Sequence, residues 1–138
     1  MTVGLLVLTC AAFVYTRVRE SLEAEETLHA YRVVLDALTV YVRESNGRWP
    51  ESWDELSRVA PTGSHGVFDW PADIPDISKR VHVRFDLTAS DVAEMDSSRF
   101  TAVEQMGPNY GPDLARIEQL KETSGFAVTQ EGKSRPSP

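Results

Sequence analysis

The stretch "RVRESLEAEETLHAYRVVLDALTVYVRES", residues 17–45, decides the fold, because it predicts one long helix. It contains no Pro or Gly, and its second half repeats apolar residues at spacings of three and four, as one helix face does. Four polar residues fall mainly elsewhere on the helix, so we expect their side chains to be solvated: Arg32, Asp36, Thr39 and Arg43. The apolar face consists of Leu28, Tyr31, Leu35, Leu38 and Val42, widened by Val34 and Tyr41.

The preceding stretch, "MTVGLLVLTCAAFVYT" at 1–16, carries no charged side chain, and every charged residue lies in 17–138. This segregation predicts a transmembrane anchor at 1–16 that continues into the amphipathic helix at 17–45. A spanning helix usually needs about 17–25 residues, and the uncharged stems of Arg17 and Arg19 can extend a shorter run. A cleaved signal peptide, a buried helix and a lipoprotein acylated at Cys10 are the other interpretations of this run.

The predicted location follows from the anchor. We expect a single-pass membrane protein whose folded head lies on the periplasmic or outer side. Arg17 and Arg19, directly after the run, would by the positive-inside rule favour the opposite orientation. A single helix over residues 3–45 would be about 65 Å long at 1.5 Å per residue.

The long helix has a clear stop signal, because Asn46-Gly47 can supply a left-handed cap after its last turn. Pro50 then restricts Trp49 to an extended conformation. Ser52, with Glu55 three residues later, is a capping-box pattern that predicts a short helix at 51–59.

The rest of the head, residues 46–126, is predicted to hold a small antiparallel sheet with short accessory helices. The clearest strand is "VHVRFDL" at 81–87, because its apolar residues alternate with polar ones. The fold class is therefore α+β, with the long helix packed on the sheet. The remaining patterns predict a loop at 66–80, a helical turn at 88–98 capped by Ser90, a strand at 99–106, a turn at 107–112, a helix at 112–123 ended by Gly125, and a disordered tail at 127–138.

The order of these parts resembles type IV pilins and the pseudopilins of type II secretion. The local resemblance lies in "LHAYRVVLDALTVYVRESNGRWPESWDEL", residues 28–56, where Tyr41, the Asn46-Gly47 turn, Trp49-Pro50 and a short helix ending at Leu56 follow in order. Chains of this family have a Gly cleavage point and a Glu at the fifth mature position; here Gly4 is the candidate and Thr9 stands fifth after it. The resemblance implies the helix-on-sheet architecture and a role in assembly.

The sequence offers no catalytic set. Its three histidines, His29, His65 and His82, are scattered, its one cysteine lies in the apolar run, and its net charge is −7 with no basic cluster. These features exclude a nucleic-acid partner and predict a protein that is not an enzyme and binds no cofactor. A calcium site at Asp69, Asp73 and Asp76 is one interpretation of these acidic residues, and turn and cap roles are the other.

The predicted function is therefore that of a membrane-anchored, non-enzymatic, pseudopilin-like protein acting through protein contacts in an envelope or secretion assembly. The alternative is a membrane-anchored accessory or ligand-binding domain that forms no filament. The expected partners are membrane lipid and a homo- or hetero-oligomer formed through the amino-terminal helix. The predicted interaction residues are Leu5, Leu6 and Leu8 in the apolar run and Trp49, Pro50 and Trp53 in the head.

Overall fold

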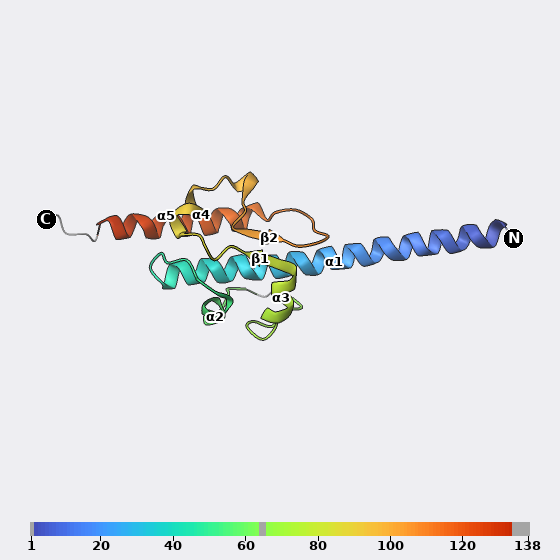
Figure 1. The fold of residues 1–138 in the computed structure, drawn as a ribbon, viewed down its shortest axis with the longest axis horizontal. Coiled ribbons are helices and arrows are strands. Elements are labelled where there is room, and N and C mark those ends of the chain that lie inside the picture. Colours follow the sequence, from blue (N-terminus) through green and yellow to red (C-terminus); the bar gives the residue numbers. More distant parts are fainter. Residues whose placement is uncertain (1, 64–65, 134–138) are drawn as a thin grey trace.

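The computed structural model describes residues 2–63 and 66–133. One long helix, α1, runs the length of the molecule, and a small head surrounds its second half (Figure 1). The structure thus confirms the α+β class, with a long amino-terminal helix and a small antiparallel sheet. The elements in order are α1 (Thr2–Glu44), α2 (Trp53–Leu56), α3 (Ile74–Arg80), β1 (Val81–Val83), α4 (Ala89–Glu94), the 3-10 helix η1 (Ser97–Arg99), β2 (Val103–Gln105) and α5 (Leu114–Lys133).

The end of α1 has the predicted left-handed cap. Asn46 and Gly47 have φ angles of 55° and 91°, and the N–H of Gly47 donates to the carbonyl of Val42 at 2.9 Å. A carbonyl of the last helical turn is thereby satisfied, and the chain reverses toward Trp49. The sequence signal and the geometry agree at this point.

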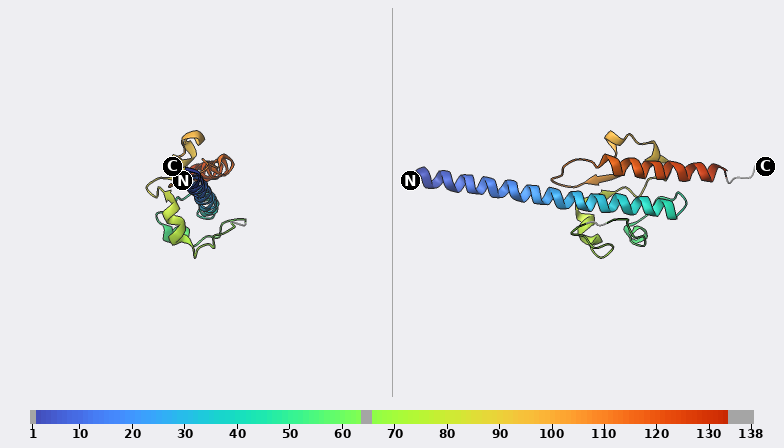
Figure 2. Two further views of the ribbon diagram at one scale, coloured as in Figure 1. Left: turned by 90° about the vertical axis from the view of Figure 1, so that its right-hand side faces the viewer. Right: turned by 180° about the vertical axis from the view of Figure 1, so that it is seen from behind.

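The second half of α1 is the axis of the head. Helix α5 packs along one side of it, and α2, α3 and the sheet cover other sides, as the end-on view of Figure 2 shows. Every residue from Val33 to Val42 is buried as a result. The prediction that Asp36 and Thr39 are solvated is therefore wrong: their exposed fractions are 8% and 4%. The Thr39 hydroxyl donates to the Leu35 carbonyl at 2.9 Å, which satisfies it within the helix.

The sheet has two antiparallel strands, with Val81 opposite Gln105 and Val83 opposite Val103. Val81 and Val83 face the core and His82 is exposed, as the alternation predicted. Both strands are shorter than predicted, since the pairing ends after the N–H of Arg84 donates to the carbonyl of Ala102 at 2.9 Å. Beyond this point the chain turns, and Phe85 is only half-buried.

The predicted loop at 66–80 is wrong in part, because it contains a helix, whereas the predicted helical turn at 88–98 is confirmed with a different cap. The predicted loop at 66–80 contains α3, whose Pro75 lies in the first turn, where a helix tolerates proline. The cap of helix α4 lies two residues earlier than predicted. Thr88 rather than Ser90 is its cap, and Thr88 and Asp91 form a reciprocal capping box.

Helix α5 runs to Lys133, well past the predicted end at Gly125. A Cβ at Gly125 would lie 3.7 Å from the Ala93 side chain, so this glycine sits at the contact between α5 and α4 rather than at a cap. The predicted disordered tail at 127–138 is wrong for the helical residues up to Lys133, and its last five residues lie outside the described part of the chain.

The predicted membrane anchor is not supported. No helix in the described ranges, 2–63 and 66–133, is both long enough and apolar enough to cross a membrane. The uncharged run is short, polar Thr9 interrupts it, and Arg17 and Arg19 follow it directly. This finding corrects three predictions: the transmembrane helix at 1–16, the single-pass membrane protein, and the location with a periplasmic or outer head.

Candidate interaction surface

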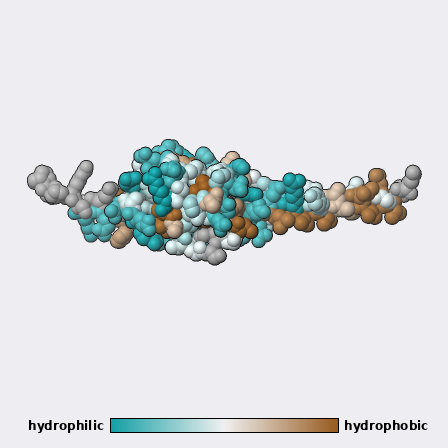
Figure 3. Space-filling model, turned by 90° about the horizontal axis from the view of Figure 1, so that it is seen from below, coloured by the Kyte–Doolittle hydropathy of each residue, from teal (hydrophilic) through white to brown (hydrophobic). Residues whose placement is uncertain are grey.

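The first half of α1 leaves the head as a free rod. We call residues 2–22 the projecting segment, because residues 3–22 are all exposed and the first half-buried residue is Glu23. Figure 3 shows hydrophobic colour concentrated along one side of this rod and at its tip. Ten large apolar side chains of the segment are exposed: Val3, Leu5, Leu6, Val7, Leu8, Phe13, Val14, Tyr15, Val18 and Leu22.

The polar groups of the projecting segment are satisfied largely within it. The Thr9 hydroxyl donates to the carbonyls of Leu5 and Leu6, both at 2.9 Å, and Thr16 donates to Ala12 at 2.8 Å. Such bonds fold a hydroxyl back onto its own helix and reduce its polar character. The segment therefore presents mainly apolar side chains to its surroundings.

Ion pairs lie near the base of the rod. Arg17 pairs with Glu20 at 3.8 Å and Arg19 with Glu23 at 3.1 Å, and all four side chains are exposed. Exposed pairs at this helical spacing contribute only a few tenths of a kcal/mol to stability. Their main effect is to make the surface around residues 17–23 hydrophilic. The guanidinium of Arg17 also lies 5.2 Å from the centre of the Phe13 ring.

A loop of the head holds the base of the rod. The Tyr110 hydroxyl lies 2.7 Å from Ser21 Oγ and donates to the Ser21 carbonyl at 3.1 Å. Gly107 and Gly111, both with φ above 80°, let the chain turn on either side of this contact. On the same part of α1, a cleft of about 540 Å³ is lined by residues that include Glu26, Arg80 and Met106. Arg80 pairs with Glu26 at 2.5 Å across it.

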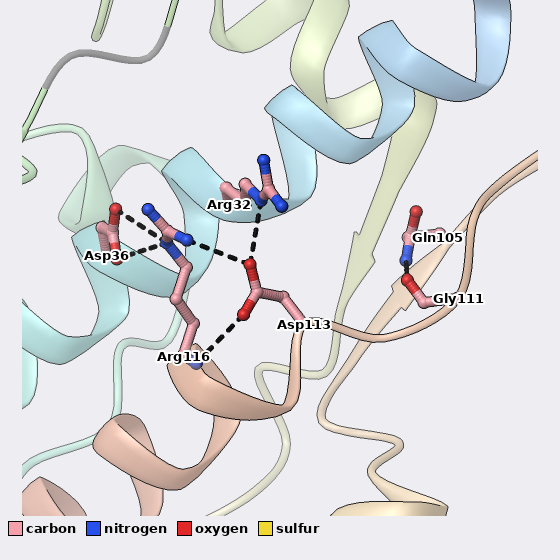
Figure 4. Close-up of polar contacts among 6 residues, drawn as sticks. All are labelled: Arg32, Asp36, Gln105, Gly111, Asp113 and Arg116. Atoms are coloured by element: carbon pink, nitrogen blue, oxygen red, sulfur yellow. Dashed lines mark hydrogen bonds and ion pairs between the residues drawn. The ribbon is translucent and has the colours of Figure 1, made fainter. Parts of the chain in front are cut away.

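A charge network fixes α5 against α1 (Figure 4). The carboxylate of Asp113 accepts from Arg32 Nε at 2.9 Å and from Arg116 Nη1 at 3.0 Å. Its other oxygen accepts from the backbone N–H of Arg116 at 3.2 Å, while Arg116 Nε donates to Asp36 at 3.1 Å. Burial alone would raise the pKa of Asp113, but the hydrogen bonds from Arg116 and Arg32 hold that pKa below its usual value.

The network also acts on a neighbouring tyrosine. Burial, reinforced by the negative charge of Asp113, raises the pKa of Tyr31 to about 12. The phenol of Tyr31 is therefore neutral at physiological pH. We interpret the network as structural, because its members pair with one another and orient the start of α5.

The predicted interaction residues fall into two groups. Leu5, Leu6 and Leu8 are exposed on the projecting segment, with fractions of 70%, 67% and 70%. Trp49 and Pro50 are buried, and the Trp49 indole donates to the Arg84 carbonyl at 2.9 Å. Trp53 is half-buried and meets the Phe85 ring edge-on at 5.7 Å between centres. The structure therefore places the three leucines on an accessible surface and the other three residues in the packing of the head.

The predicted interaction residues did not include the part of this surface nearest the head. Tyr15, Val18 and Leu22 are also exposed, with fractions between 53% and 69%. Their signal was present in the sequence, because they continue the apolar residues of the upstream run at helical spacing. Tyr15 lay inside the predicted anchor at 1–16 without being named as an interaction residue, and Val18 and Leu22 fell in the predicted amphipathic helix at 17–45.

The described residues contain no group of three or more His, Cys, Asp or Glu side chains placed to hold a metal ion. Asp73 instead accepts the backbone N–H of Asp69 at 2.7 Å, and Asp76 pairs with Lys79 at 3.4 Å. Asp73 thus has a turn role, one of the turn and cap roles that competed with the calcium interpretation, and Asp76 forms a surface ion pair. His65 lies outside the described part of the chain.

Comparison of the chain with family models, with curated proteins and with solved structures found no match. The resemblance to pilins and pseudopilins therefore stays a prediction from the sequence pattern.

Proposed function

We propose that this protein is a non-enzymatic, pseudopilin-like assembly subunit that acts by docking its projecting segment onto helices of other protein chains in an envelope or secretion assembly. One observation carries the proposal: ten large apolar side chains are exposed on the projecting segment, which the head contacts through Tyr110 at its base. Contiguous apolar surfaces of this kind mark interaction sites on proteins.

The free energy of association favours burial of the apolar side chains of the projecting segment against a partner. Burying an exposed Val, Leu or Phe side chain contributes about 1.5–3 kcal/mol, so covering half of the ten contributes roughly 8–15 kcal/mol from this chain alone. A partner helix adds a similar amount from its own side chains. Association costs roughly 4–15 kcal/mol in lost freedom of motion, so the apolar surface is large enough to drive assembly.

The form of the molecule also supports an assembly role. The head packs around the second half of α1; Tyr110 contacts the base of the rod at Ser21, and the Asp113 network holds α5 to α1 further along the helix, at Arg32 and Asp36. A rigid connection between head and rod would let the docked rods set the positions of the heads. This arrangement is the one that the resemblance to pseudopilins implies.

The alternative function, an accessory or ligand-binding domain, would use a cleft such as the one beside Glu26 and Arg80. These two side chains already pair with each other across the cleft. A ligand would have to compete with that pair, so the cleft supports a function less strongly than the exposed rod does.

Site-specific photo-crosslinking in the cells that make the protein tests the proposal. A benzophenone amino acid at Leu5 should form covalent adducts with other protein chains, identifiable by mass spectrometry. The same probe at Glu51, an exposed position on the head, is the matched control and should form few adducts. Absence of protein adducts from Leu5 at the natural expression level would contradict the proposal.

A further inference from the structure

We propose that the projecting segment pairs with the same segment of a second copy, as an antiparallel two-stranded coiled coil. This inference rests on the proposed function, and it identifies the partner and its direction. The evidence is a seam of side chains on α1, its pattern of large and small residues, and the distribution of charge along the rod.

The seam follows the spacing that coiled coils require. Its residues recur at alternating intervals of four and three, which places them on one side of a helix facing a partner. The next two positions of the series are Glu25 and His29, so the apolar seam ends where the head begins. The seam consists of Gly4, Leu8, Ala11, Tyr15, Val18 and Leu22, all of which are exposed.

The opposite side of the rod near the head is charged. At helical spacing, Arg17, Glu20 and Glu23 lie away from the seam. Figure 3 shows the corresponding division, with one hydrophobic side and one hydrophilic side on the rod next to the head. This is the division expected for a helix that packs one side against a partner and leaves the other in water.

Residue size favours an antiparallel partner. Antiparallel pairing of the seam with itself sets Gly4 opposite Leu22, Leu8 opposite Val18, and Ala11 opposite Tyr15. Each of these pairs joins a larger side chain to a smaller one, which lets successive layers interdigitate. A parallel pair in register would instead place Tyr15 against Tyr15 and Gly4 against Gly4, which crowds one layer and leaves a void in another.

Charge favours the same direction. Glu20, Glu23, Glu25 and Glu26 form an acidic collar around the base of the rod; Arg17 and Arg19 offset part of this charge and leave residues 17–26 with a net charge of −2. In a parallel pair in register the two collars would lie side by side, and like charges so placed oppose association. In the antiparallel pair Glu23 lies beside Val3 of the second copy. The two Glu23 side chains are then about 30 Å apart along the axis, well beyond the screening length of about 8 Å at physiological salt.

The rod has the right length for this pairing. Leu22, which is 57% exposed, is the last exposed residue before half-buried Glu23 and buried Ala24. Pairing Leu22 with Gly4 therefore uses the whole seam and brings the tip of each rod to the edge of the opposite head. Because the contact is self-complementary, it closes a two-fold dimer.

Sedimentation equilibrium of the purified full-length protein tests the association. The wild type should sediment with the mass of two copies. Leu8→Asp places a charge in the seam and should shift the mass to that of one copy. Leu6→Asp is the matched control, because Leu6 has nearly the same exposure, 67% against 70%, but lies off the seam; it should remain a dimer.

Cysteine trapping tests the direction. In a Cys10→Ser background, the single variants Leu8→Cys and Val18→Cys are mixed and oxidised, and the disulfides are identified by mass spectrometry. The antiparallel pair should give the mixed disulfide between positions 8 and 18 in large excess. A parallel pair in register would give disulfides between identical positions, because only residues in the same layer come within bonding reach.

Three results would overturn the inference: a wild type that stays monomeric, an assembly larger than two copies, or disulfides mainly between identical positions. The proposed function is judged separately by the photo-crosslinks from Leu5 in cells. Adducts to other chains together with a monomeric purified protein would reject the antiparallel pair and leave the proposed function standing. A monomeric protein without adducts would reject both.

Discussion

At the scale of single residues, Asp113 is the charged group on which the packing of the head depends most. Its side chain is 11% exposed, and it accepts hydrogen bonds from Arg32 on α1 and from Arg116 on α5. One carboxylate thus joins two helices that lie far apart in the sequence. Without its charge, two partly buried guanidinium groups would lose a partner.

Asp113→Asn should lower the free energy of unfolding by about 1–3 kcal/mol, because hydrogen bonds to charged groups contribute in this range when partly buried. Urea unfolding at neutral pH measures the change. Asp54→Asn is the control: Asp54 pairs with Arg58 at 2.8 Å, but both side chains are more than two-thirds exposed, so its loss should change little. Equal effects of the two substitutions would contradict a structural role for the network.

The effect of Asp113 should depend on pH in a definite direction. The pKa of Asp113 in the folded protein is below its usual value, which is about 3.9 in an unfolded chain. Its charge therefore stabilises the fold fully above the unfolded pKa, and this contribution is lost as the pH falls through the folded pKa. The stability difference between wild type and Asp113→Asn should shrink below about pH 4. A difference that stays constant down to pH 2 would contradict this assignment.

At the scale of elements, the sequence predicted α1 and its cap because each depends on neighbouring residues. The long run without Pro or Gly and the Asn46-Gly47 stop need no tertiary information. The predictions failed where packing overrides a local signal. Gly125 continues α5 because it fits against Ala93 of α4, and Asp36 is buried because α5 covers the side of α1 that was expected to be wet.

The candidate site shows the same limit. The exposed leucines of the apolar run were predicted as an interaction surface, and the structure places them on a free rod. Trp49 and Pro50 could equally be core or surface from their local pattern, and only the fold shows that they are buried. The Asp113 network joins residues about 80 positions apart, so no local pattern could have indicated it.

The end of α5 should contribute little to the stability of the head. Among the side chains of α5 that the structure describes, the last buried one is Ser124, and Phe126 is 70% exposed. Removal of residues 127–138 should therefore change the free energy of unfolding by less than about 0.5 kcal/mol, as surface changes usually do. Leu120→Ala in the same helix, which empties a fully buried position, should cost about 2–5 kcal/mol. Thermal unfolding of both variants measures the contrast, and a large loss from the truncation would reveal a packing role for the helix end.

At the scale of the whole molecule, the two halves of α1 differ in the interactions that stabilise them. The second half is surrounded by the head, with every residue from Val33 to Val42 buried. The first half has exposed side chains, hydrogen bonds and ion pairs within the helix, and a contact from Tyr110 at Ser21 near its base, whereas most helical stability in proteins comes from packing. The same helix should thus be stable at one end and dependent on a partner at the other.

Hydrogen exchange followed by mass spectrometry should show this difference directly. At low protein concentration, amides of residues 5–20 should exchange rapidly, because an unpacked helix end opens locally, whereas amides of residues 33–42 should exchange only on global unfolding. Raising the concentration should slow exchange in 5–20 and leave 33–42 unchanged, since association packs only the rod. In Leu8→Asp the concentration dependence should disappear. Strong protection of 5–20 at the lowest concentration would show instead that the rod is stable without a partner, and it would remove the physical reason for assembly.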